Sequence, residues 1–251
     1  LTYITYQTFP ADTANSLQSI GMIKNFIRNQ HNIRLVFPNR SSESNDDIQK
    51  LQQYYSFKEF FEIDMLEHNL PFNDKKKVHF KKLRFHISHF IWSRKAVLHV
   101  LKNERFEEKY FTRSDWIFLF LTKKGKSIIF ECHQLSKIRK WIVRYTLKNK
   151  NAKIIFTNKL LLEDLKISKK YLDNIKILEN GFDEDFFSSN KEIVKVENSV
   201  IFVGKLLRFG KDRNIEFLIK AFKDTRLKNY TSNIVGGPNS RKNELVAKLN
   251  N

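Results

Sequence analysis

The chain has 251 residues, of which 41% are hydrophobic and 23 are Phe, so it can bury the cores of more than one domain of roughly 100–200 residues. Its single cysteine, Cys132, excludes an intrachain disulfide framework and a multi-cysteine metal site. The formal net charge of +19 favours anionic partners, but the cations are spread along the chain and no RNA-binding motif of the K/R-G-F-G-F kind occurs, so nucleic acid is not the expected partner.

No apolar run approaches the ~18 residues of a membrane span. Together with the lone cysteine, this favours a reducing, cytoplasmic location, and the positive charge is compatible with a peripheral position at the inner face of an anionic membrane. The chain opens on Leu1 rather than Met. We therefore expect that its true N-terminus is missing, and a lost leader peptide remains an option.

The first 38 residues predict a strand, a helix and a second strand. Residues 1–7 are rich in the β-favouring Thr, Tyr and Ile, and residues 32–38 (NIRLVFP) form the second strand. Asn15 and Ser16 lie between the first strand and the helix, where they can cap the helix or contact a ligand at the carboxyl edge of a parallel sheet. The helix is indicated by apolar residues at helical spacing, namely Leu17, Ile20, Ile23, Phe26 and Ile27.

Residues 46–55 and 57–68 carry helical patches, and residues 75–102 predict a basic, aromatic helix. The charged face of this last helix would point to solvent in an ordinary packed arrangement, or towards headgroups if the helix lay on a membrane. His86 and His89 are spaced three apart. Because no acidic ligand is nearby, we do not expect them to bind a metal.

Two buried strands are predicted next, over 116–121 and 127–131. The sequence Phe-Glu-Cys-His then places His133 at the carboxyl edge of the sheet, close to Glu131. A histidine there can hydrogen-bond a sugar hydroxyl or move a proton near neutral pH, or it can be a loop residue satisfied by backbone. Glu131 would orient this histidine or cap a helix, and Cys132 is expected to be inert. Helices and strands then continue to alternate, over 135–147, 153–157, 158–166 and 176–178.

The stretch from 200 to 222 predicts a buried strand, a glycine turn, a basic loop and a helix. Gly204 permits the tight turn. Lys205 and Lys211 bring cations to the loop before the helix, an arrangement that can bind a diphosphate. In a chain this basic, the same lysines can also be ordinary solvated charges.

Several short motifs, in matching order, resemble the family 4 glycosyltransferases, which are retaining enzymes of GT-B fold. The run VGKLLRFGKDRNIEFLIKAF resembles the start of their second domain, IVGGP resembles their IVG-x-GP segment, and ENGFDEDF resembles the NG-x-D part of their NG-x-D-x-x-x-F signature. Thr-Arg-Ser at 112–114, the E-x-H that ends at His133 and the opening P-x-x-x-x-N-S loop also match.

The resemblance implies that Lys205 and Lys211 bind the diphosphate of a nucleotide-sugar donor, with Gly204 leaving room for it. Lys205 stands where the family usually has arginine, which keeps the charge and loses the bidentate fork. Gly236 and Gly237 would bring their backbone close to the donor.

The same resemblance makes His133 the catalytic-site residue that contacts the sugar or the acceptor. Asn15 and Ser16 would contact a ligand from the first loop. Asp183 and Phe186 would fix the crossover between the domains. The rival interpretation is that Asp183 and Asp185 form a catalytic carboxylate pair, although two acids separated by one residue in a turn rarely face each other.

The implied fold is α/β of GT-B type, with an acceptor-side Rossmann-like domain at 1–190 and the beginning of a nucleotide-sugar-binding domain at 191–251. The expected reaction moves a sugar from a nucleotide-sugar to a saccharide or lipid-linked acceptor, in surface polysaccharide or lipopolysaccharide assembly. No cofactor or metal is expected, since protein cations would neutralise the leaving diphosphate. The paired glutamates of the family's second domain would lie beyond this chain, so we expect a fragment that is inactive alone.

Two alternatives stay open. One is a nucleotide-sugar epimerase of the same fold, because a fold does not determine a reaction. The other is a non-enzymatic basic module for nucleic acid or an anionic membrane, which would bind with steep salt dependence and without preference for nucleotide-sugars.

Overall fold

A computed structural model describes residues 1–40, 44–68, 70, 81–181, 195–208 and 211–249. The chain divides into two compact units, Leu1–Glu184 and Asp185–Asn251, and each is described here by itself. Asp183, Asp185 and Phe186 lie outside the described residues, as does the start of the predicted 75–102 helix.

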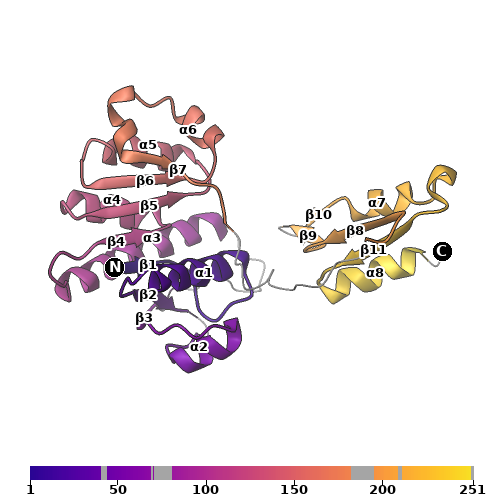
Figure 1. Cartoon of the computed structure of the whole chain (residues 1–251), viewed down its shortest axis with the longest axis horizontal. Coiled ribbons are helices and arrows are strands. Elements are labelled where there is room, and N and C mark those ends of the chain that lie inside the picture. The colour runs from indigo at the N-terminus through magenta and orange to yellow at the C-terminus, as the bar shows by residue number, and fades with distance from the viewer. Residues whose placement is uncertain (41–43, 69, 71–80, 182–194, 209–210, 250–251) are drawn as a thin grey trace. The chain divides into compact units, whose positions relative to one another are not determined.

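The first unit is built on a seven-stranded sheet in which every pair of neighbours is parallel. The strand order is β3-β2-β1-β4-β5-β6-β7, so the chain moves outward in one direction from β1 and in the other from β4 (Figure 1). In open sheets of this kind, ligands bind outside the carboxyl ends of the strands where the order reverses. The strands are β1 (Thr2–Ile4), β2 (Arg34–Asn39), β3 (Glu62–Glu67), β4 (Tyr110–Thr112), β5 (Ile128–Cys132), β6 (Ala152–Phe156) and β7 (Ile175–Ile177).

Helices cover both faces of this sheet. The side chains of β1 show the alternation, because Tyr3 packs into one core cluster and Ile4 into the other. The cluster that contains Tyr3 includes side chains of α1 (Ala14–Arg28) and α2 (Ile48–Tyr55). The cluster that contains Ile4 includes side chains of α3 (Lys81–Lys102), α4 (Asp115–Lys123), α5 (Lys137–Thr146) and α6 (Lys159–Leu165). A 3-10 turn at Lys169–Asn174 precedes β7.

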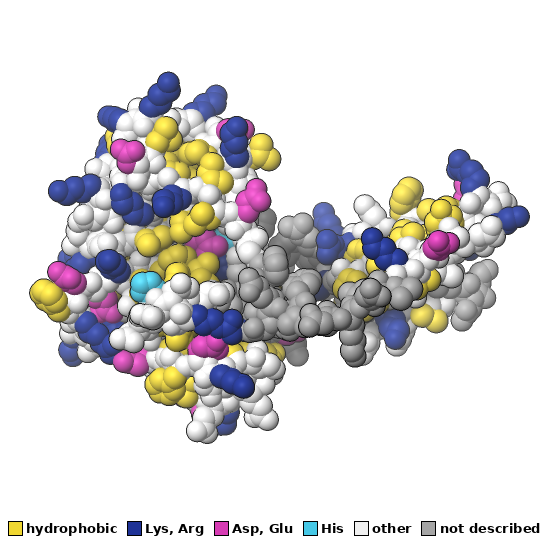
Figure 2. All heavy atoms as spheres, viewed as in Figure 1, with side chains coloured by type: hydrophobic (Ala, Val, Ile, Leu, Met, Phe, Trp, Pro, Cys, Tyr) yellow, Lys and Arg dark blue, Asp and Glu magenta, His cyan; other side chains and the backbone are white. Residues whose placement is uncertain are grey.

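This architecture confirms the predicted α/β class and the Rossmann-like parallel sheet of the first unit. Parallel strands buried on both faces read as short apolar runs, which is why β5 and β6 were recognisable in the sequence. None of the helices that the structure describes is both long and apolar enough to span a bilayer. On the face shown in Figure 2, Lys and Arg side chains are scattered over the first unit and do not form a single stripe.

Two predicted elements are wrong. Residues 116–121 are helical, as part of α4, because Ser114 caps a helix that begins at Asp115 and its hydroxyl accepts a hydrogen bond from the Ile117 N–H. The helix is apolar on most sides because it packs between its neighbours and the sheet, so it lacks a 3.6-residue pattern. The second error is the helical patch at 57–68, which contains edge strand β3; its side chains are only partly buried, so the sequence shows no clean alternation there.

The second unit contains a two-stranded parallel sheet, in which β8 (Ser199–Val203) pairs with β11 (Thr231–Val235). The basic loop after β8 contains an antiparallel hairpin of β9 (Leu207–Arg208) and β10 (Lys211–Asp212), where the sequence predicted only a loop. A small core holds Leu206, Ile215 and Leu245. The remaining elements are α7 (Ile215–Ala221), a 3-10 turn at Thr225–Leu227 and α8 (Asn239–Leu249).

Candidate functional site

Three loops at the carboxyl edge of the first unit's sheet bring polar side chains together. They follow β1 and β4, which flank the point where the strand order reverses, and β5, which lies next to β4. Asn15 lies in the first turn of α1, Arg113 directly follows β4, and Glu131 and His133 lie at the end of β5. This is the edge where open α/β sheets bind their ligands.

Glu131 is the centre of this cluster. Its side chain is only 4% exposed, and one carboxylate oxygen, Oε1, lies 2.6 Å from Nε2 of His133. The other oxygen, Oε2, lies 3.9 Å from Nε of Arg113 and has no hydrogen-bond partner among the described residues. A buried carboxylate is costly to desolvate unless it is paired, so the two cationic or hydrogen-bonding neighbours stabilise it.

Hydrogen bonds extend the cluster to distant parts of the chain. The Gln18 amide donates to Oδ1 of Asn180 at 2.9 Å and lies 3.5 Å from Oε1 of Glu131. The guanidinium of Arg113 lies 3.4 Å from Oδ1 of Asn15. These contacts join the first helix, two strand ends and the Asn-Gly turn near the end of the unit into one network.

The arrangement can position a proton carrier. Glu131 fixes the His133 ring through one nitrogen, while a quarter of the His133 side chain stays exposed. An imidazole held this way can donate a hydrogen bond to a ligand hydroxyl or take up a proton from it. The sequence identified both residues but gave no sign that Gln18 and Asn180 would join them.

Asn15 and Ser16 have different surroundings. Thr13, rather than either of them, caps α1, since its hydroxyl accepts the backbone N–H of Ser16. The Ser16 hydroxyl is buried and donates to Oε1 of Gln7 at 3.0 Å, so it holds the first loop to the helix. Asn15 is exposed beside Arg113, which leaves it the better placed of the two for ligand contact.

In the second unit, the glycines at the ends of β8 and β11 touch each other. The Gly204 N–H donates to the Val235 carbonyl at 3.0 Å, and the Leu206 N–H donates to the Gly237 carbonyl at 2.8 Å. A Cβ on Gly236 would lie 1.8 Å from the Gly204 carbonyl oxygen. Close backbone packing therefore requires glycine at Gly236, whatever ligand is bound.

Lys205 and Lys211 are both exposed, one directly after Gly204 and the other in β10. The side chain of neither lysine forms an ion pair or a hydrogen bond with another residue that the structure describes. Their charges are thus available to an anion near the carboxyl end of β8.

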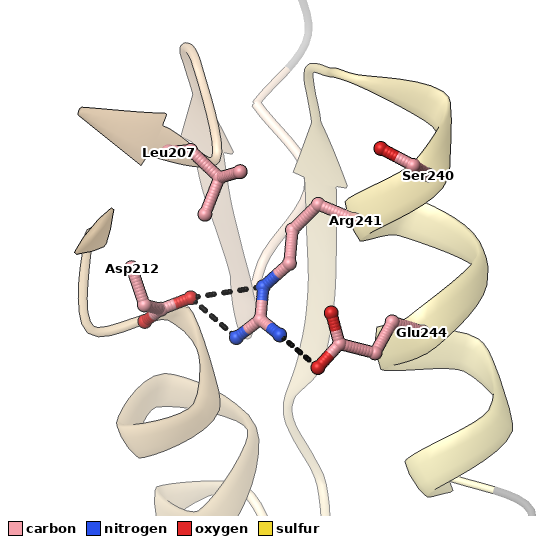
Figure 3. Close-up of a pocket in the computed structure, with 5 residues that line it drawn as sticks. All are labelled: Leu207, Asp212, Ser240, Arg241 and Glu244. Atoms are coloured by element: carbon pink, nitrogen blue, oxygen red, sulfur yellow. Dashed lines mark hydrogen bonds and ion pairs between the residues drawn. The ribbon is translucent and has the colours of Figure 1, made fainter. Parts of the chain in front are cut away.

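A hollow of about 300 Å³ in the same unit is lined by Leu207, Asp212, Ser240, Arg241 and Glu244 (Figure 3). The Arg241 guanidinium lies between carboxylates, at 2.6 Å from Asp212, 2.7 Å from Glu216 and 2.6 Å from Glu244. Hydrogen bonds from Lys248 and Arg241 lower the pKa of Glu216 to about 2. The charge of Arg241 is therefore already neutralised by carboxylates, so the guanidinium is not free to bind a diphosphate. The residues that line the hollow form a structural ion-pair cluster. The sequence did not predict it.

A second polar cluster lies buried between α3 and the carboxyl edge of the first unit's sheet. The Ser88 hydroxyl lies 2.6 Å from the Tyr6 hydroxyl and 2.8 Å from Nε2 of His68. Nε2 of His89 lies 2.7 Å from the Ser114 hydroxyl. Burial lowers the pKa of both histidines to about 4, so both are neutral at pH 7.

The structure also places the two histidines at spacing three, His86 and His89, and the single cysteine, Cys132. His89 is held by Ser114 and is buried away from exposed His86, and no metal-binding group of three His, Cys, Asp or Glu occurs in the described parts of the chain. Burial raises the pKa of the Cys132 thiol to about 11, which agrees with an inert side chain. No known protein-family model and no curated protein matches this sequence.

Proposed function

We propose that this chain belongs to a metal-independent, retaining glycosyltransferase of GT-B type, which moves a sugar from a nucleotide-sugar to a saccharide or lipid-linked acceptor. The observation that carries the proposal is the Glu131–His133 pair at the carboxyl end of β5, one strand from the point where the sheet reverses its strand order. An acid–imidazole pair at that edge suits contact with a sugar hydroxyl.

Two features of the second unit support the same proposal. Lys205 and Lys211 have no carboxylate partner among the described residues and follow a parallel strand, so they can neutralise a diphosphate leaving group. The Arg241 guanidinium does not compete for this role, because three carboxylates surround it. Synthesis of surface polysaccharide or lipopolysaccharide is the setting we propose, with the chain acting in the cytoplasm.

Ligand binding tests the proposal without requiring turnover. Calorimetric titration with a panel of nucleoside diphosphates and their sugar conjugates should find one base that binds. We expect the Lys205→Ala, Lys211→Ala double variant to lose at least tenfold in affinity for both forms, since each lysine contributes a charge-assisted contact. The matched control is Lys223→Ala, an exposed lysine of the same unit, which should bind as the wild type does.

His133 provides the second arm of this test. In the proposed site it contacts the sugar or the acceptor, so His133→Ala should weaken binding of the sugar conjugate and leave the affinity for the free nucleoside diphosphate unchanged. Equal affinity of all variants for every nucleotide would refute the proposal. Interconversion of the bound sugar in the absence of an acceptor would instead identify an epimerase.

A further inference from the structure

The outer face of α5 exposes aromatic and aliphatic side chains. The inner side of the helix buries Ile142 and Val143, whereas Ile138, Trp141 and Tyr145 are 50%, 54% and 42% exposed. The Trp141 and Tyr145 rings stack on each other with their centroids 5.8 Å apart. Exposed aromatic rings of this kind bury apolar area at low entropic cost when a partner covers them.

A basic hollow of about 510 Å³ adjoins this face. Its lining contains three lysines and no carboxylate, and consists of Thr122, Lys123, Tyr145, Lys148, Asn149 and Lys150. The Lys123 ammonium lies 5.6 Å from the centre of the Tyr145 ring, which joins the hollow to the aromatic pair. The Asn149 amide donates to the Thr122 carbonyl at 3.2 Å and fixes the wall between the two helices.

The three lysines of the hollow have no ion-pair partner within the described parts of the chain, in contrast to Lys126 and Lys140 nearby, which are paired with Glu104 and Asp164. The ends of α4 and α5 attract cations through their helix dipoles, which explains a lysine at each end. The dipoles do not explain why aromatic rings are exposed beside those lysines. The combination of uncompensated cations and interfacial aromatic side chains requires a partner that is both anionic and apolar.

Helix α3, on the other side of α4 from α5, exposes apolar side chains of its own. It packs on α4 in the same layer and exposes a stripe at four-residue spacing, made of Leu83, Ile87 and Ile91. Cations Arg84, Arg94 and Lys95 accompany the stripe on the exposed side of this helix. The Trp141–Tyr145 pair beside the lysine-lined hollow favours a membrane over a small soluble anion, because such an anion would leave the aromatic rings uncovered.

We propose that Ile138, Trp141 and Tyr145, together with Lys123, Lys148 and Lys150, form a docking face for the surface of a membrane rich in anionic phospholipid. The aromatic rings would sit at the level of the headgroups, and the lysines would pair with lipid phosphates. We call these six residues the α5 face.

The three lysines of the α5 face lie at the opposite edge of the sheet from the candidate catalytic residues. Helices of a parallel sheet run opposite to the strands, and the Asn151 amide after α5 reaches the Gly125 carbonyl after α4, so the hollow lies near the amino edge of the sheet. Glu131 and His133 lie at the carboxyl edge. Variants of the three lysines therefore test membrane docking without changing the proposed sugar site.

Vesicle sedimentation tests the docking face directly. We expect the protein to bind vesicles of phosphatidylcholine with 30% phosphatidylglycerol and not vesicles of phosphatidylcholine alone. The Lys123→Gln, Lys148→Gln, Lys150→Gln variant should lose about fivefold per lysine, on the order of a hundredfold in total. Trp141→Ser should lose about tenfold, because an exposed ring no longer enters the interface.

The matched control carries the same change of charge in the second unit, as Lys220→Gln, Lys223→Gln, Lys228→Gln, and should bind nearly as the wild type does. Trp141 also reports on docking by fluorescence, since Trp92 is fully buried and Trp116 partly buried. Its emission should shift to shorter wavelength on anionic vesicles and not in inorganic phosphate.

Four outcomes would overturn this proposal. The first two are the absence of binding to anionic vesicles and an equal loss of binding in the control variant. The third is binding of inorganic phosphate alone. The fourth is preferential binding of an RNA or DNA oligonucleotide, if the changes at Lys123, Lys148 and Lys150 abolish it. None of these outcomes depends on the transferase proposal, because no nucleotide-sugar is used.

Discussion

At the scale of single residues, Gly236 shows how a glycine predicted to contact a ligand can be required by the packing of the backbone alone. Its absent side chain lets two strand ends meet, since an added Cβ would lie 1.8 Å from the Gly204 carbonyl oxygen. We expect Gly236→Ala to destabilise the second unit by about 2 kcal/mol or more, because backbone must move to relieve the overlap. Urea unfolding followed by hydrogen exchange of residues 199–249 measures this loss.

The neighbouring Gly237 is the control for this prediction. The nearest atom to an added Cβ there is the Asn239 nitrogen at 3.9 Å, which is an ordinary contact. Gly237→Ala should therefore cost well under half as much as Gly236→Ala. If the two variants were equally stable, the close approach of the strand ends would be wrong.

Sequence reasoning identified residues of the candidate site where a side chain ends a strand, as with Glu131 and His133. It did not identify the partners that come from elsewhere in the chain. Gln18 and Asn180 are 162 positions apart, and only the fold of the first unit brings their side chains within 2.9 Å of each other. No local pattern encodes such a contact, because it depends on the strand order.

At the scale of secondary structure elements, the sequence was most informative where the apolar pattern has a length or spacing typical of one element type. The apolar stripe of α1 and the short runs of β5 and β6 predicted those elements, whereas α4, which is apolar on most sides, was assigned to a strand. Ser114 was the missed signal, because a hydroxyl residue before an apolar run can be a helix cap as well as the end of a loop.

The cap at Ser114 supports a prediction about α4. The Ser114 hydroxyl accepts the Ile117 N–H and also contacts Nε2 of buried His89 at 2.7 Å. We expect Ser114→Ala to cost about 2 kcal/mol, from the lost cap and from a histidine left without its partner. Ser136→Ala removes the exposed cap of α5, whose hydroxyl accepts the Arg139 N–H and has no other hydrogen bond to a described side chain, and should cost about 1 kcal/mol or less. Urea midpoints compare the two, and an equal loss would show that the His89 contact contributes nothing.

At the scale of the whole molecule, the two units differ in how much of their surface they bury. The first has extensive cores on both faces of its sheet, while the described core of the second consists of three buried residues, Leu206, Ile215 and Leu245. Strand residues such as Ile201 and Val203 are more than half exposed in the second unit. Cooperative stability is therefore concentrated in the first unit, and its buried polar groups set the response of the chain to acid.

Those buried polar groups predict a loss of stability below neutral pH. His68 and His89 have pKa values lowered to about 4 by burial, against an ordinary value of about 6.5. Between these values the unfolded chain binds protons that the folded chain does not, so the free energy of unfolding falls as the pH decreases from 6.5 to 4, by at most about 3 kcal/mol for each histidine. Glu216, with a pKa lowered to about 2, adds its own loss only at more acidic pH. Urea titrations at pH 7, 6, 5 and 4.5 should show this slope, and it should flatten in His68→Gln, His89→Gln while exposed His31→Gln retains it. A slope that is unchanged in the double variant would show that other groups take up the protons.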